Sequence, residues 1–204
     1  FVERRQDLAL LAEDDRIFAA MEQLLGKGLV WGGSEGNKGS FNESRDHQWH
    51  SDRAGQIELA YPRIKIMIYL QAMTQDAGAL RVLPGSHHPD FHKRLLPLQG
   101  QGPDTCREAF GVAGDELCGV PLEVVPGDVV VFDHYLYHAV YGKSDARRYL
   151  AMKFAADPVT QVQAEALRVH HQDASQLHDH FRHSDRLRIR SLVHRLLFWE
   201  QESP

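Results

Sequence analysis

The chain has 204 residues, of which 43% are hydrophobic and 25% charged, the length and composition of one folded domain rather than of a disordered, collagenous or fibrous protein. A formal net charge of −5 at pH 7 gives no general attraction for nucleic acid or an anionic membrane, so neither partner is expected. No stretch approaches the roughly 18 apolar residues of a membrane span, and no secretory-signal pattern is visible. The two cysteines, Cys106 and Cys118, form no disulfide framework, which predicts a cytoplasmic location.

The first half of the sequence predicts a helix, a loop and a buried strand. Apolar residues recur at intervals of three and four from Leu8 to Leu25, and Gly26 and Gly28 end this amphipathic helix. The Gly-rich polar segment 31–39 is predicted to be a loop. Segment 64–70 is enriched in β-branched residues, which predicts a strand buried on at least one face.

The second half predicts short strands separated by Gly/Pro turns, followed by helix. The predicted strands are 79–83, 122–125, 129–132 and 148–154. From Gln161 onward the apolar period lengthens, and the stripe that begins at Leu187 predicts a C-terminal helix. This order predicts a mainly β fold with flanking helices, namely a jelly-roll or cupin-like barrel.

We expect a single domain over residues 1–204. It comprises an N-terminal helix and loop (1–48), a β core (49–156) with an inserted lid (89–120), and a C-terminal helical segment (157–204). The apolar stripe of the C-terminal helix suits either packing on the barrel or a homo-oligomer contact, and the sequence favours neither.

Histidine is unusually frequent, with 13 residues, and it is a common transition-metal ligand. His50 and Asp52 have the i, i+2 spacing that places both side chains on one face of a strand. A second histidine from a distant strand would complete the facial triad of two histidines and one carboxylate that binds Fe(II) and leaves coordination positions open. His138, which follows the strand 129–132, is the best candidate, and His134 competes with it.

Two adjacent arginines follow this histidine. Arg147 or Arg148 can bind a carboxylate through two parallel hydrogen bonds, a geometry that lysine cannot reproduce. The order His-x-Asp, His, Arg is a much stronger signal than any one of its members.

Two further His-x-Asp tripeptides, His171 to Asp173 and His183 to Asp185, lie in helical or loop sequence and are expected on the solvated surface. The histidines at 178, 180 and 183 are likewise interpreted as a polar helix face.

Three segments, in this order, resemble the phytanoyl-CoA dioxygenase family of Fe(II)/2-oxoglutarate-dependent oxygenases. They are Trp-His-Ser-Asp at 49–52, Gly-Ala-Leu-Arg-Val-Leu-Pro-Gly-Ser-His at 78–87, and the stretch from Gly127 through His138 to Arg147. The resemblance implies a double-stranded β-helix in which His50, Asp52 and His138 bind iron. It also implies an arginine on the distal carboxylate of 2-oxoglutarate, for which Arg147 fits the family spacing better than Arg148.

The resemblance further implies hydroxylation, or another oxidation, of a small molecule, with conversion of 2-oxoglutarate and O2 to succinate and CO2. Asp52 argues against halogenation, because halogenating relatives replace this carboxylate with a small residue. No motif indicates the substrate.

Two alternatives stay open. Pro126, Gly127 and Asp128 ahead of a strand and a histidine also fit a cupin-type metalloenzyme without 2-oxoglutarate, which would need neither arginine. A non-catalytic binding domain on the same barrel is the other, because a fold does not determine a function.

Overall fold

The computed structural model describes residues 1–38, 46–53, 61–99, 104–142, 147–174 and 177–202. Its contacts divide the chain into two compact units. Unit 1 consists of Phe1–Gly36, Tyr61–Ile66 and Leu150–Pro204, and unit 2 of Asn37–Ala60 and Met67–Tyr149. This division follows contacts rather than chain order, and the predicted single domain stays a prediction.

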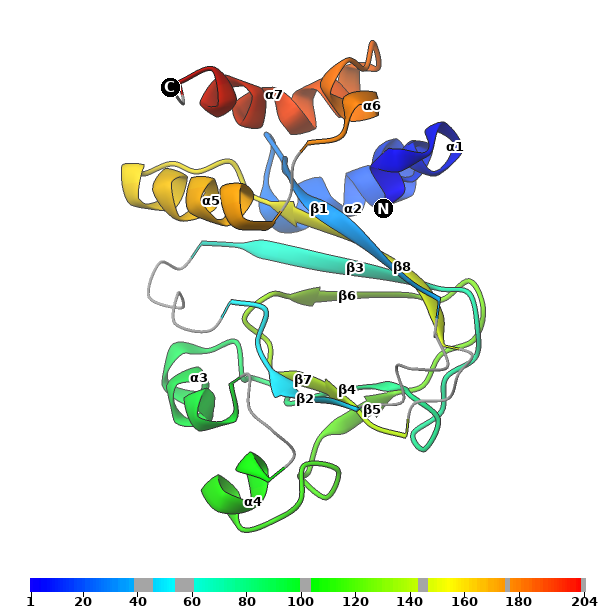
Figure 1. The fold of residues 1–204 in the computed structure, drawn as a ribbon, viewed down its shortest axis with the longest axis vertical. Helices are drawn as coiled ribbons and strands as arrows, with labels where there is room; N and C mark the ends of the chain where they lie inside the picture. Colours follow the sequence, from blue (N-terminus) through cyan, green and yellow to red (C-terminus); the bar gives the residue numbers. More distant parts are fainter. Residues whose placement is uncertain (39–45, 54–60, 100–103, 143–146, 175–176, 203–204) are drawn as a thin grey trace. The chain divides into compact units, whose positions relative to one another are not determined.

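The strands among the described residues form two four-stranded sheets (Figure 1). One has the order β1-β8-β3-β6, and the other has the order β2-β7-β4-β5. Their bounds are β1 (Val30–Lys38), β2 (His47–His50), β3 (Arg63–Tyr69), β4 (Leu80–Val82), β5 (Val120–Leu122), β6 (Val129–Asp133), β7 (His138–Val140) and β8 (Arg148–Ala155). The predicted strands 64–70, 79–83, 129–132 and 148–154 therefore correspond to β3, β4, β6 and β8. The strand predicted at 122–125 begins earlier, as β5, and Val124 makes only an isolated bridge to Met73.

The N-terminal part of unit 1 is helical but interrupted, unlike the single helix predicted from Leu8 to Leu25. It comprises η1 (Val2–Arg4), α1 (Gln6–Ala9), η2 (Leu10–Glu13) and α2 (Asp15–Leu25). The break lies at Asp14, whose backbone is non-helical and whose carboxylate accepts a hydrogen bond from the Arg16 N–H at 3.0 Å. An aspartate in this position caps a new helix, because it satisfies a backbone donor that the first turn leaves free.

Strand β1 corrects the loop predicted for residues 31–39. A Cβ atom on Gly32 would lie 3.0 Å from the carbonyl oxygen of Lys153 in β8, the strand next to β1. Glycine is therefore present because two backbones approach closely, a known role of glycine inside strands. The composition alone suggests a loop, since glycine is otherwise depleted in strands.

The C-terminal part of unit 1 consists of α5 (Gln161–Ala174), α6 (Asp179–Arg182) and α7 (Leu187–Glu202). The predicted apolar stripe of α7 is buried at Ile189, Leu192, Val193 and Leu196, whereas Leu187 is exposed. No helix among the described residues is both long and apolar enough to cross a membrane.

In unit 2 the segment predicted to be a lid is mainly helical. It contains α3 (Pro89–Leu95), η4 (Leu96–Leu98) and α4 (Thr105–Phe110). Its buried side chains Leu95, Leu98 and Cys106 share one hydrophobic cluster with Trp49, Leu83, Tyr137, Ala139 and Tyr141, which come from β2, β7 and the chain around β4 and β7. The insertion therefore packs against one face of the second sheet.

Candidate metal centre

His50 and His138 are brought together by the pairing of β2 with β7. The two strands are antiparallel, and His50 lies directly opposite His138. From His47 to His50 the strand advances three residues while its partner advances two, from Val140 to His138, so β2 has one extra residue just before the histidine. Such a bulge re-aims the side chains that follow it.

The neighbours of the two histidines show which face of the sheet they occupy. Trp49 and Ala139 are buried in the cluster beneath the inserted helices. Because successive side chains of a strand point to opposite faces, His50 and His138 project from the other face. Their ring centroids are 4.3 Å apart.

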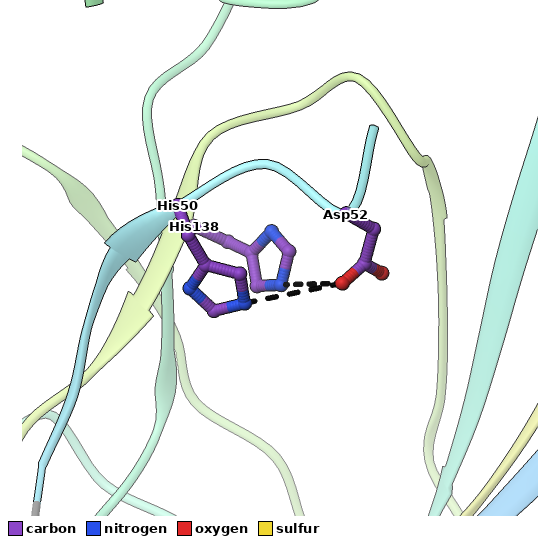
Figure 2. Close-up of side chains that lie close together, drawn as sticks. All are labelled: His50, Asp52 and His138. Carbon is purple, nitrogen blue, oxygen red and sulfur yellow. Dashed lines mark ion pairs between the residues drawn. The ribbon is translucent and has the colours of Figure 1, made fainter. Parts of the chain in front are cut away.

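Asp52 is the third member of this group. The i, i+2 spacing suggested that it shares a strand face with His50, but its position has another cause. Strand β2 ends at His50, and Asp52 lies in the turn that follows. The turn, not strand alternation, directs its carboxylate toward the histidines, as Figure 2 shows. Its Oδ1 lies 3.9 Å from Nε2 of His50 and 3.9 Å from Nε2 of His138.

Hydrogen bonds determine which ring nitrogen each histidine presents. Nδ1 of His50 lies 2.7 Å from the carbonyl oxygen of Gln48, and Nδ1 of His138 lies 2.9 Å from that of Leu136. A carbonyl oxygen only accepts, so Nδ1 carries the proton and donates it in both cases. The Nε2 lone pairs then point at one place, together with Asp52, and the ligand atoms lie within 4.8 Å of one another. This donor set fits a divalent transition-metal ion.

The centre is more accessible on one side than on the other. The His138 side chain is only 5% exposed, and the ring of Phe132 in β6 packs edge-on against it with centroids 5.0 Å apart. The side chains of His50 and Asp52 are 31% and 18% exposed. His138 is thus buried against Phe132, while solvent reaches the His50 side, where further ligands could enter.

The two candidate arginines differ in their surroundings. Arg148 is exposed, whereas Arg147 is 2% exposed. Nε of Arg147 donates to the carbonyl oxygen of Gly78 at 3.1 Å, and the guanidinium lies 4.6 Å above the centre of the Tyr149 ring. Its Nη1 is buried without a hydrogen-bond partner among the described residues. A buried charged donor is costly unless it is paired, so this atom is suited to the carboxylate of a ligand.

Other histidines that the sequence analysis singled out do not join this group where the structure describes their side chains. His134 is buried, but it does not belong to the metal-ligand group found among the described residues. His178 caps α6 and accepts a hydrogen bond from the His180 N–H at 3.3 Å, and His183 is exposed. The side chains of His171 and Asp173 lie outside the described residues.

Sequence reasoning missed Gln99, which contacts Ser51, the residue between the candidate ligands His50 and Asp52. Its side-chain amide makes two hydrogen bonds to the backbone of Ser51. No motif marks this glutamine, because its partner lies far away in the sequence and the contact exists only in the folded chain.

A family model described as phytanoyl-CoA dioxygenase (PhyH) matches residues 9–150, more than half of the chain. The chain belongs to the phytanoyl-CoA dioxygenase family. A curated protein of similar sequence is dioxygenase lolE1 of Epichloe uncinata, 33% identical over 100 residues. The match covers 48% of this chain and 35% of lolE1, so the chain spans much less than the full length of that protein.

Several solved structures share the fold of this chain. Iron-bound HygX from Streptomyces hygroscopicus has a TM-score of 0.56 at 15% identity, covering 79% of this chain and 72% of HygX. EctD from S. alaskensis with bound Fe has a TM-score of 0.54 at 24% identity, covering 75% of this chain and 54% of EctD. EvdMO1 has a TM-score of 0.55 at 24% identity, covering 76% of this chain but 34% of EvdMO1. The predicted fold class, a mainly β double-stranded β-helix with flanking helices, is confirmed.

Proposed function

We propose that this member of the phytanoyl-CoA dioxygenase family is a non-haem Fe(II)/2-oxoglutarate-dependent dioxygenase that oxidises a small molecule. The observation that carries the proposal is the convergence of two imidazole Nε2 atoms and one carboxylate oxygen on a single place in unit 2. A structure of HygX with nickel and 2-oxoglutarate bound, and one of EctD with Fe bound, support it from proteins of the same fold.

The residues that would hold the metal are His50, Asp52 and His138. Three protein ligands leave coordination positions for a co-substrate and O2. When bound, iron and 2-oxoglutarate would supply the activation of O2, with conversion of 2-oxoglutarate to succinate and CO2 and transfer of one oxygen atom to the substrate. The backbone carbonyls that accept from each Nδ1 keep both histidines in the tautomer that a metal requires.

Arg147 is the residue that we assign to the distal carboxylate of 2-oxoglutarate. The Gly78 carbonyl and the Tyr149 ring orient its guanidinium, and the buried Nη1 is left to donate to a ligand. Arg148 is exposed and has no such setting. We assign it no role in co-substrate binding.

Hydroxylation is the reaction outcome that we propose. The carboxylate of Asp52 would supply the third protein ligand of the metal, so it would leave no position there for a halide. We propose a small-molecule substrate, and the net charge of −5 gives no general attraction for a polyanion.

Anaerobic titration of the purified protein with Fe(II) and then 2-oxoglutarate tests the proposal. We expect a weak visible metal-to-ligand charge-transfer band in the wild type that is lost in His138→Ala. Iron binding without the band on addition of 2-oxoglutarate would favour the cupin-type alternative. Absence of iron binding would refute an oxygenase function for this chain.

A further inference from the structure

Ser51 separates the proposed ligands His50 and Asp52, and its backbone is bound by one side chain. The Ser51 N–H donates to Oε1 of Gln99 at 2.9 Å, and Nε2 of Gln99 donates to the Ser51 carbonyl oxygen at 3.0 Å. A single amide side chain thus satisfies both backbone groups of a residue that is 2% exposed. Buried backbone groups need such partners, so the Ser51 backbone is held in one conformation.

The Ser51 hydroxyl ties the same turn to the other arm of the site. Its Oγ donates to the carbonyl oxygen of His134 at 3.0 Å and accepts from the Arg53 N–H at 3.2 Å. His134 lies in the short segment that leads into β7 and hence to His138. Ser51 therefore connects the turn that carries Asp52 with the segment that carries the second histidine.

Gln99 is itself well anchored. It follows η4, and its own N–H donates to the Leu96 carbonyl oxygen at 3.0 Å. The preceding Leu98 is buried in the cluster that contains Trp49, the residue before His50. Nε1 of Trp49 donates to the Gly114 carbonyl oxygen at 2.7 Å, so the inserted segment contacts the chain on both sides of His50.

We propose that Gln99 is a positioning residue of the metal centre. By fixing the Ser51 backbone, it sets the separation between Nε2 of His50 and the carboxylate of Asp52. The proposal rests on the proposed function, because it requires that His50, Asp52 and His138 bind a metal. The physical reason is that rotation about the Ser51 backbone would swing Asp52 relative to His50, and a ligand set held by its supporting contacts binds metal more tightly than a mobile one.

The test is titration of metal-free protein with Co(II), followed by visible absorption. The variants are Gln99→Ala, which removes the amide, and Gln99→Met, which keeps most of the side-chain volume. Gln75→Ala is the matched control, because Gln75 is an exposed glutamine in the same unit. Thermal unfolding of each metal-free protein verifies that it is folded at the temperature of the titration, so that a change in affinity reports on the site.

We expect both Gln99 variants to bind Co(II) about 10- to 100-fold more weakly than the wild type, with an altered visible spectrum, as is typical when an outer contact of a ligand is removed. Gln75→Ala should match the wild type. If the wild type binds Co(II) and folded Gln99 variants bind it as tightly with the same spectrum, Gln99 has no positioning role and the proposed function stands. If the wild type itself does not bind Co(II), the proposed function fails and this inference fails with it.

Discussion

Replacement of Arg147 by lysine tests the assignment of the co-substrate site most directly. Lysine keeps the positive charge near Tyr149 but cannot form two parallel hydrogen bonds, and it loses the bond from Nε to the Gly78 carbonyl oxygen. A hydrogen bond to a charged group contributes about 1.5–3 kcal/mol. Because Arg147 is 2% exposed, solvent screens this energy little. Loss of one such bond predicts a roughly 10- to 160-fold weaker affinity for 2-oxoglutarate.

Arg148→Lys is the matched control, because it makes the same change at the adjacent, exposed arginine. The affinity is measured anaerobically in the presence of Fe(II), by following the charge-transfer band as 2-oxoglutarate is added. We expect Arg148→Lys to behave as the wild type. An equal loss of affinity in the two variants, or an unchanged affinity in Arg147→Lys, would refute the reasoning from burial.

Three further predictions concern the metal, the core and pH. His138→Ala should weaken Co(II) binding by more than about 100-fold, which exceeds the loss expected when only a residue that contacts a ligand is changed. His88→Ala, at an exposed position, should bind Co(II) as the wild type does. Tight binding of Co(II) by His138→Ala would remove His138 from the proposed ligand set. Gly119→Ala should lower the free energy of unfolding, measured by urea titration, by about 1–3 kcal/mol, because the alanine Cβ would collide with the Trp49 indole ring. An unchanged free energy of unfolding would show that the ring can move. Although burial alone would raise it, the pKa of Glu35 is lowered by ion pairs with Lys65 at 2.7 Å and Lys153 at 3.1 Å. Its ionised form therefore contributes stability that is present near neutral pH and lost as the pH falls through the lowered pKa. Glu35→Gln should accordingly lose less stability than the wild type between neutral and acidic pH, and parallel pH profiles of thermal unfolding would contradict this.

Much of the fold and the candidate ligand set could be predicted from local sequence. Runs rich in β-branched residues indicated β3 and β6, and the apolar stripe of α7 indicated a buried helix face, because these elements follow from patterns within a few residues. His50, Asp52 and His138 were recognisable from residue type, order and resemblance to the family. Their role in binding metal stays a prediction, although the structure places their ligand atoms within 4.8 Å of one another.

Local sequence failed where a contact with a distant segment determined the outcome. The glycines of β1 suggested a loop, but Gly32 allows the strand to approach Lys153 closely. The environment that decides the conformation of β1 is formed by residues far away in the chain, so a local pattern cannot contain it. The inserted lid expected at 89–120 stays a prediction.

The sequence by itself determined the chemistry available to this protein: two imidazoles, a carboxylate and two adjacent arginines in a fixed order. Only the tertiary structure decided how these groups are used. The pairing of β2 with β7 and the turn after His50 bring the candidate ligands together, and burial distinguishes Arg147 from Arg148. The contact of Gln99 with the Ser51 backbone likewise exists only in the folded chain. A side chain's neighbours, exposure and direction depend on register and packing between segments, and these are properties of the folded chain rather than of any short stretch of it.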